Sequence, residues 1–274
     1  MAGLGKAQPL CDASAAMCLD GLPRITGPAW PGVQYFTTTI HGGVSEGDWA
    51  SFNLGSHVGD DPEAVAHNRR QLEQWLPNPP VWLQQVHGTR VFHPDTRMMP
   101  DHEAPEADAA VTVEPDRVLA ILTADCLPVV IGCPEVSVLG VAHAGWRGLA
   151  AGVLRDTVAT LKRHGSMRPG HRLRAWIGPA ISQPCFEVGN DVVQAFVSTN
   201  ASYSSFFIPG ARADKWLADL AGIAACQLRE EGVEQVDLSG LCTWTRNDLL
   251  YSYRRKPGTG RQATVAWLDG SWCG

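Results

Sequence analysis

The run VLAILTADCLPVV, from Val118 to Val130, is apolar except at its centre, where Asp125 and Cys126 stand. A continuous apolar run of this kind is typical of a buried β-strand. A buried carboxylate is costly without a partner, so Asp125 needs one, such as Arg147 or a cluster of backbone amides. A buried cysteine is by default a small apolar side chain, so Cys126 alone predicts no function.

Two neighbouring segments have a similar pattern, VWLQQVHGTRVFH at residues 81–93 and VSVLGVAHAGWRG at residues 136–148. With the opening run they predict three buried strands and therefore a central sheet. Each predicted strand ends in a residue that binds metals or does nucleophilic chemistry: His87, Cys126 and His143. We expect the three strand ends to lie close together.

Two imidazoles and a thiolate are a ligand set for catalytic zinc, with water in a fourth, open position. The three residues are too far apart in the chain to fit a local zinc-finger pattern. A metal-free alternative is a cysteine hydrolase, in which Cys126 is the nucleophile and His87 or His143 is its base. In a third interpretation, the cysteine only packs in the core and the histidines only make structural hydrogen bonds.

The rest of the chain alternates helical and strand patterns without a repeat or a long linker. Asp60 or Asp61 and Pro62 mark a helix start. Helices are predicted over residues 62–76, 149–165, 190–198 and 214–231, and strands over residues 172–178, 233–239, 249–255 and 263–268. The order favours one compact α+β domain over residues 26–274, after an N-terminal extension at residues 1–25.

The composition excludes several classes of protein. A hydrophobic content of 45% with 18% charged residues is typical of an ordinary globular protein, and the net charge of −6 argues against nucleic acid or an anionic membrane as partner. No apolar run reaches the roughly 18 residues of a membrane helix, and charged residues interrupt the N-terminal segment where a signal peptide would have its apolar core. Eight cysteines without a C-x-x-C pair indicate reduced thiols. We therefore expect a cytoplasmic protein with a small-molecule partner.

Taken together, the motifs resemble the YfiH or laccase-domain family, which includes the peptidoglycan editing factor and human FAMIN. The resemblance covers nearly the whole chain after the extension. The motifs that carry it are GGVS at 42–45, FNLGSHVGDDPEAVAHNR at 52–69, VWLQQVHG at 81–88, DAAVT at 108–112, LTADCLPV at 122–129, VAHAGWRGLAAGVL at 141–154, WIGPAI at 176–181, FEVG at 186–189, YSYRR at 251–255 and TGR at 259–261.

The resemblance implies a four-layer α/β/β/α sandwich with mixed sheets. It also implies zinc held by His87, Cys126 and His143. The implied activities are phosphorolysis of adenosine, inosine, guanosine and methylthioadenosine, with purine nucleoside and phosphate as partners, and deamination of adenosine. Other names in the family imply an amidase that edits peptidoglycan precursors and a copper-bound polyphenol oxidase.

Physical chemistry orders these activities. A catalytic zinc lowers the pKa of bound water to about 7, which suits deamination and amide hydrolysis. Phosphorolysis needs a phosphate site, for which the planar fork of Arg147 is the candidate. Multicopper oxidation needs many imidazole ligands, commonly in His-x-His pairs, and the sequence has no such pair. A single site of two histidines and a cysteine could still hold copper. A non-enzymatic metabolite-binding module is the remaining alternative.

One position departs from the family pattern. Members often carry an arginine two residues before the glycine pair of GGVS, where this chain has Ile40. His41 is a candidate to replace that arginine. Asn53 and His57 lie in a closely matching loop, and Asn53 is a further candidate for substrate binding, although a loop asparagine commonly serves a turn.

Overall fold

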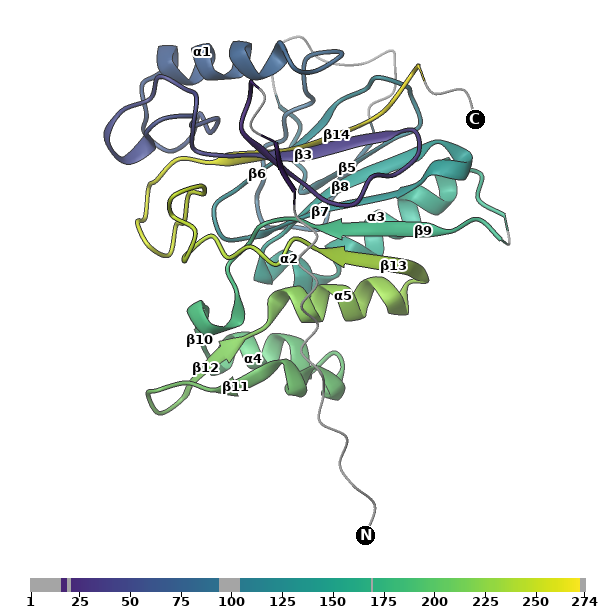
Figure 1. The fold of residues 1–274 in the computed structure, drawn as a ribbon. Coiled ribbons are helices and arrows are strands. Elements are labelled where there is room, and N and C mark those ends of the chain that lie inside the picture. The colour runs from purple at the N-terminus through teal and green to yellow at the C-terminus, as the bar shows by residue number, and fades with distance from the viewer. Residues whose placement is uncertain (1–15, 19–20, 94–103, 169, 272–274) are drawn as a thin grey trace.

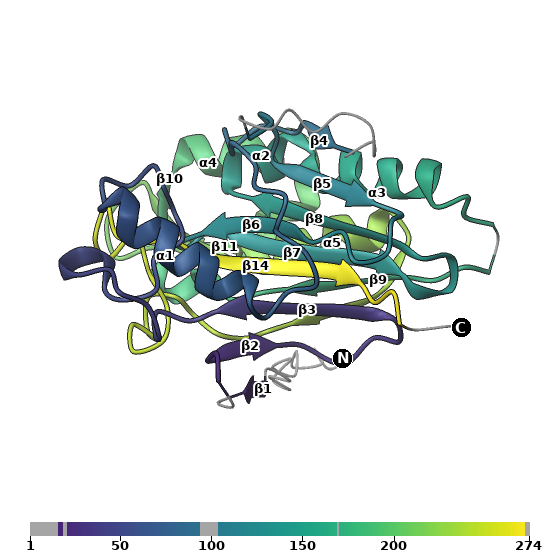
Figure 2. The same ribbon diagram turned by 90° about the horizontal axis from the view of Figure 1, so that it is seen from above.

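The computed structural model describes residues 16–18, 21–93, 104–168 and 170–271. Two large β-sheets pack face to face, as the views from the side and from above show (Figures 1 and 2). Helix α1 (Pro62–Glu73) packs on the outer face of the first sheet, through Leu72. Helices α3 (Val153–His164) and α5 (Leu220–Glu230) cover the outer face of the second. This order of layers confirms the predicted α/β/β/α sandwich of the α+β class.

The first sheet has five strands, and all of its neighbouring strands are antiparallel. In spatial order they are β1 (Ala16–Cys18), β2 (Arg24–Thr26), β3 (Val33–Thr38), β14 (Gln262–Leu268) and β6 (Leu119–Thr123). The sheet therefore begins within residues 1–25, where the sequence shows no strand pattern.

The second sheet is mixed, because its two outer pairs are parallel and its inner pairs antiparallel. In spatial order its strands are β13 (Val233–Leu238), β9 (Leu173–Ile177), β7 (Leu127–Cys133), β8 (Val138–Ala144), β5 (Ala109–Thr112) and β4 (Val91–Phe92). Both sheets contribute to the core between them, where Trp176 and Ile121 are fully buried.

The apolar run from Val118 to Val130 contributes to two strands rather than one. Strand β6 belongs to the first sheet and β7 to the second, so the chain crosses between the sheets at Asp125 and Cys126. Both strands are buried on both faces, which explains why the sequence is apolar without alternation. The single central sheet expected from the three apolar runs is therefore wrong, and two sheets share these strands.

Segment 81–93 forms only the two-residue strand β4 and isolated bridges at Val81 and Gln84, so the predicted long strand is wrong. The predicted helix 149–165 is two helices, α2 (Trp146–Ala151) and α3, because Gly152 adopts a φ of 99° between them. Leucine and valine spacing continues across this break, which is why the sequence shows one helix.

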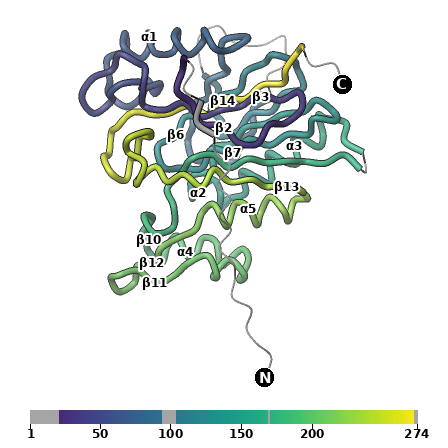
Figure 3. The backbone as a smooth tube through the Cα atoms, viewed as in Figure 1, coloured from purple at the N-terminus to yellow at the C-terminus, as the bar shows by residue number. Residues whose placement is uncertain are grey.

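The C-terminal third differs from prediction at two further points. The first four residues after Asp214 form strand β12 (Lys215–Ala218), and α5 starts only at Leu220. Residues 249–255 form turns instead of a strand. Strand β12 pairs with β10 (Glu187–Gly189) and β11 (Phe207–Pro209) in a small sheet beside α4 (Asn190–Val197), which lies below the main sandwich (Figure 3).

Helix α1 begins as predicted, with Asp61 accepting a hydrogen bond from the amide of Glu63 and Pro62 in the first turn. Among the residues that the structure describes, no helix combines the length and the apolar character needed to cross a lipid bilayer.

Candidate functional site

Cys126 lies where the chain passes from one sheet to the other. Asp125, just before it, adopts a φ of 92°, a left-handed backbone that aspartate tolerates better than most residues. The Asp125 carboxylate accepts hydrogen bonds from the Thr243 hydroxyl at 2.5 Å and from the Arg254 amide at 2.6 Å. These two donors, rather than Arg147, are the partners that this carboxylate needs, and they hold the Cys126 turn in place.

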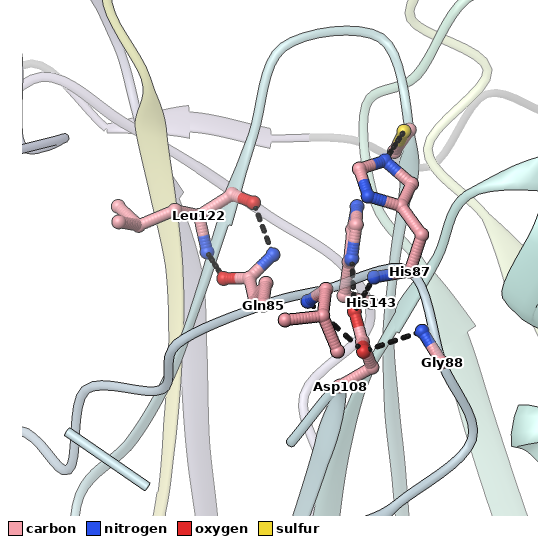
Figure 4. Close-up of polar contacts among 8 residues, drawn as sticks. Gln85, His87, Gly88, Asp108, Leu122 and His143 are labelled. Carbon is pink, nitrogen blue, oxygen red and sulfur yellow. Dashed lines mark hydrogen bonds and ion pairs between the residues drawn. The ribbon is translucent and has the colours of Figure 1, made fainter. Parts of the chain in front are cut away.

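His87 lies on a loop, also with a left-handed backbone, at a φ of 60°. The buried carboxylate of Asp108 accepts hydrogen bonds from the amides of Val86, His87 and Gly88, at 3.2, 2.9 and 2.6 Å (Figure 4). Three successive amides directed at one anion form a compact nest that fixes this unusual backbone. The loop thus takes its shape from a carboxylate and not from a sheet ladder.

The side chain of Gln85 ties the same loop to the first sheet. Its amide group donates to the Leu122 carbonyl and accepts from the Leu122 amide, both at 2.8 Å (Figure 4). This pair of bonds replaces the strand pairing that the sequence predicts here. His87 is consequently held close to the turn that carries Cys126.

His143 lies near the end of β8 and is only 3% exposed. Its Nδ1 atom is 2.8 Å from Oδ1 of Asp108, the carboxylate that also binds the His87 loop. An imidazole nitrogen bonded to a carboxylate carries the proton, which leaves Nε2 free to bind a metal. Asp108 therefore orients both histidines at once.

The ligand atoms of His87, Cys126 and His143 all lie within 4.8 Å of one another. Sγ of Cys126 is 3.9 Å from Nε2 of His87, and the two imidazole rings are 4.7 Å apart at their centroids. Gly145 leaves room for this arrangement, since a Cβ there would lie 2.7 Å from Cδ2 of His87 and 3.1 Å from Sγ of Cys126. Two imidazoles and a thiolate at this spacing fit a zinc ion, and the same donors suit copper.

Without a metal, the cluster favours a thiolate paired with an imidazolium. Burial opposes ionisation of the Cys126 thiol, but the charge and hydrogen bond of His143 and the hydrogen bond of His87 outweigh it and lower the pKa to about 6. Burial likewise opposes protonation of His143, yet the Cys126 thiolate and the Asp108 carboxylate raise its pKa to about 9. Cys126 is thus ready to bind a cation or to act as a nucleophile.

The cluster opens into a cavity of about 750 Å³, a size suited to a nucleoside-sized ligand. Arg147, in the first turn of α2, lines the same cavity, and its guanidinium stacks over the Trp146 ring at 4.4 Å. The cationic and imidazole side chains around the wall outside the cluster are His57, Arg147, Lys215, Arg254 and Arg261. Asp125, Glu187 and Asp191 line the wall as well, so the four lysine and arginine side chains outnumber the carboxylates by one and can bind an anionic or phosphorylated group.

Asn53 does not reach the cavity. It is fully buried, and its Oδ1 atom accepts from the amides of Gly55 at 2.9 Å and Arg261 at 2.8 Å. It therefore positions the backbone of a cavity residue, while His57 lines the wall itself. Next to Ile40, the ring of His41 bonds to the Asp248 carbonyl at 2.7 Å, away from the cavity wall.

Sequence reasoning missed Asp108, Tyr253 and Arg261. Asp108 is the only charged residue in DAAVT, directly before the buried strand β5, and a buried carboxylate at such a place is a signal for a hydrogen-bonded role. Tyr253 and Arg261 lie in the YSYRR and TGR motifs. The prediction of a strand at residues 249–255 hid the fact that this segment is a loop over the cavity.

The sequence is similar to a known family and to proteins from bacteria. A family model described as multi-copper polyphenol oxidoreductase laccase matches residues 34–269. The purine nucleoside phosphorylase of Pseudomonas aeruginosa is 43% identical over 246 residues, which are 88% of this chain and 97% of that protein. The purine nucleoside phosphorylase YfiH of Escherichia coli is 40% identical over 252 residues, which are 90% of this chain and 100% of that protein.

Solved structures agree with this similarity. The crystal structure of a Neisseria meningitidis protein is 41% identical, with a TM-score of 0.83, and the match covers 92% of this chain and 100% of that one. The crystal structure of YlmD from Geobacillus stearothermophilus is 30% identical, with a TM-score of 0.82 over 94% of this chain and 99% of that one.

Proposed function

This chain belongs to the laccase-domain family, and on that premise we propose that it is a zinc-dependent purine nucleoside phosphorylase whose catalytic domain is residues 26–274, with strands β1 and β2 extending the edge of its first sheet. The observation that carries the proposal is the cluster of His87, Cys126 and His143 in the wall of a cavity with several cationic side chains. Relatives at 40% and 43% identity bear the name purine nucleoside phosphorylase, which supports the substrate class. The cytoplasm is the proposed location.

His87, Cys126 and His143 would hold the zinc ion. When bound, zinc supplies Lewis-acid polarisation and charge neutralisation next to the substrate. Asp108 keeps the His143 imidazole in one tautomer by accepting from Nδ1, and holds the His87 loop through three amides. Pre-orientation of both imidazoles avoids the cost of reorganising them when a substrate binds.

In phosphorolysis, a phosphate oxygen attacks C1′ of the ribose and the bond from C1′ to the purine nitrogen breaks. The purine leaves with the bonding electrons and takes up a proton, and ribose 1-phosphate forms. Arg147 and Arg261, both on the cavity wall, would bind the phosphate oxygens through their planar guanidinium groups. The proposed nucleosides are adenosine, inosine, guanosine and methylthioadenosine, and the last of these would yield 5-methylthioribose 1-phosphate instead.

Deamination of adenosine is a second reaction that we assign to the same site. It replaces the amino group at C6 of the purine by the oxygen of a water molecule and releases ammonia. It needs no phosphate, so it depends on the metal cluster and the purine-binding part of the cavity rather than on Arg147.

A second candidate function is a cysteine hydrolase acting on amide bonds, as in the editing of peptidoglycan precursors. One observation favours it: the lowered pKa of Cys126, about 6, which describes an activated nucleophile beside His143. Chelation separates the two functions, because a cysteine hydrolase keeps its activity without metal whereas the proposed phosphorylase loses it.

The test is a product assay with protein of defined zinc or copper content. Inosine plus phosphate should yield hypoxanthine and ribose 1-phosphate with the zinc protein, and Cys126→Ala should abolish this yield. Cys226→Ala, a cysteine on α5, is the matched control and should retain activity. Turnover that is equal in wild type and Cys126→Ala, or that occurs only with a phenol and copper, would refute the proposal.

A further inference from the structure

Tyr253 is a large aromatic residue that is 52% exposed and lies in the cavity wall. An aromatic ring left in water gives up the stabilisation that burial provides. In a concave site, such a ring commonly serves a ligand that covers it.

The backbone on both sides of Tyr253 is anchored. The amide of Arg254 donates to Asp125 at 2.6 Å, and the amide of Tyr251 donates to the buried Gln262 side chain at 2.9 Å. Asp125 directly precedes Cys126. The backbone that carries the ring is therefore held at a fixed place relative to the metal cluster, which a ligand-binding platform requires.

Tyr253 also has a cationic neighbour. The guanidinium carbon of Arg261 is 5.7 Å from the centroid of its ring, within the range of a cation–π contact. Arg261 lies in the same cavity wall, so aromatic and cationic surfaces meet there. This pairing suits a ligand that has a flat aromatic part and an anionic or electron-rich part next to it.

We propose that Tyr253 is the residue on which the base of the substrate stacks, and that it makes the site selective for purines over pyrimidines. This inference rests on the proposed function, because it names how that site recognises the base. Stacking depends on the overlapping area, so a bicyclic purine gains more from one tyrosine ring than a monocyclic pyrimidine does. Tyr253 is thus a specificity-determining residue that binds the base and does no chemistry.

The experiment measures kcat and KM of the zinc-loaded enzyme for inosine and for uridine at saturating phosphate. Loss of one stacking contact should raise KM for inosine by roughly 5- to 150-fold in Tyr253→Ala, with a smaller change in kcat. Tyr253→Phe keeps the ring and should restore KM to within about threefold of wild type. The KM for uridine should change less, so that purine selectivity falls in the alanine variant.

Ile208→Ala is the matched control, since Ile208 is a similarly exposed apolar residue, at 46%, outside the cavity wall. It should leave KM for inosine unchanged. An unchanged KM in Tyr253→Ala, or a phenylalanine variant as impaired as the alanine one, would overturn the inference. A circular dichroism spectrum and an unfolding midpoint like those of wild type confirm that a variant is folded.

A binding measurement separates this inference from the proposed function. The fluorescence of 2-aminopurine riboside should be quenched by the zinc-loaded wild type and by Tyr253→Phe, and not by Tyr253→Ala, because stacking quenches this base. Quenching that depends on Tyr253 without any phosphorolysis would refute the proposed function and support the stacking role. Phosphorolysis without quenching would support the proposed function and refute the stacking role of Tyr253.

Discussion

The substitution Asp108→Asn tests how one carboxylate organises the site. Asp108 accepts from Nδ1 of His143 at 2.8 Å and from the amides of Val86, His87 and Gly88. Asparagine has nearly the same shape, but one of its two acceptor atoms becomes an NH₂ donor. That donor would face either the amides of Val86 and Gly88, which bond to Oδ2, or the amide of His87 and Nδ1 of His143, which bond to Oδ1. Two contacts therefore turn from attraction to repulsion in either orientation.

Asp108→Asn should change two quantities, the affinity for zinc and the free energy of unfolding. Loss of a carboxylate that orients a metal-binding histidine lowers metal affinity about 10- to 100-fold, equal to about 1.4–2.7 kcal/mol. Leaving buried polar partners unpaired costs about 3–5 kcal/mol when a charged pair is broken. We therefore predict that Asp108→Asn binds zinc about 10- to 100-fold more weakly. The free energy of unfolding of the metal-free protein should be lower by up to about 5 kcal/mol.

The assay is competition for zinc with a chromophoric chelator, combined with urea unfolding of the metal-free protein. Asp116→Asn is the matched control, because Asp116 accepts one backbone amide, that of Gly270, at 3.0 Å, and lies outside the cluster. Zinc affinity of Asp108→Asn within twofold of the control would show that Asp108 does not orient the histidines, and would refute this reasoning.

Three further predictions concern the surroundings of the cluster. In metal-free protein, alkylation of Cys126 by iodoacetamide, mapped by mass spectrometry, should be fast at neutral pH and slow as pH falls through about 6, because only the thiolate reacts; a midpoint near the ordinary thiol value of about 8.5 would contradict it. Gly145→Ala would place a Cβ 2.7 Å from His87, so zinc affinity in the chelator competition should fall about tenfold or more with an unchanged circular dichroism spectrum. Thr243→Val removes the hydroxyl that donates to Asp125 at 2.5 Å and should lower the free energy of unfolding in urea by about 1–3 kcal/mol; an unshifted midpoint would show that the Arg254 amide suffices.

The convergence of His87, Cys126 and His143 was predictable because each follows or interrupts an apolar run, and apolar runs end at the edges of buried elements. The structure of these runs was harder to predict. The segment before His87 is apolar without being a strand, since Gln85 and Asp108 supply the hydrogen bonds that a ladder would otherwise make. Such side-chain substitutes leave no periodicity in a sequence.

The run from Val118 to Val130 was also hard to interpret from the sequence. Burial on both faces removes the alternation that would mark β6 and β7 as members of different sheets, so composition alone cannot separate them. The sequence also does not reveal which distant residues form hydrogen bonds, since the bond from the Arg254 amide to Asp125 joins residues 129 positions apart. The part of the cavity wall that Tyr253, Arg254 and Arg261 form could therefore be found only from the folded chain.

If phosphorolysis depends on a metal held by His87, Cys126 and His143, the rate of the reaction follows the metal content of the protein. The most direct measurement titrates zinc into metal-free protein and follows ribose 1-phosphate formed from inosine and phosphate. We expect activity to rise to a plateau at about one zinc per chain and to be absent in Cys126→Ala at every zinc concentration. Ribose 1-phosphate formed at full rate without zinc, or formed by Cys126→Ala, would contradict it.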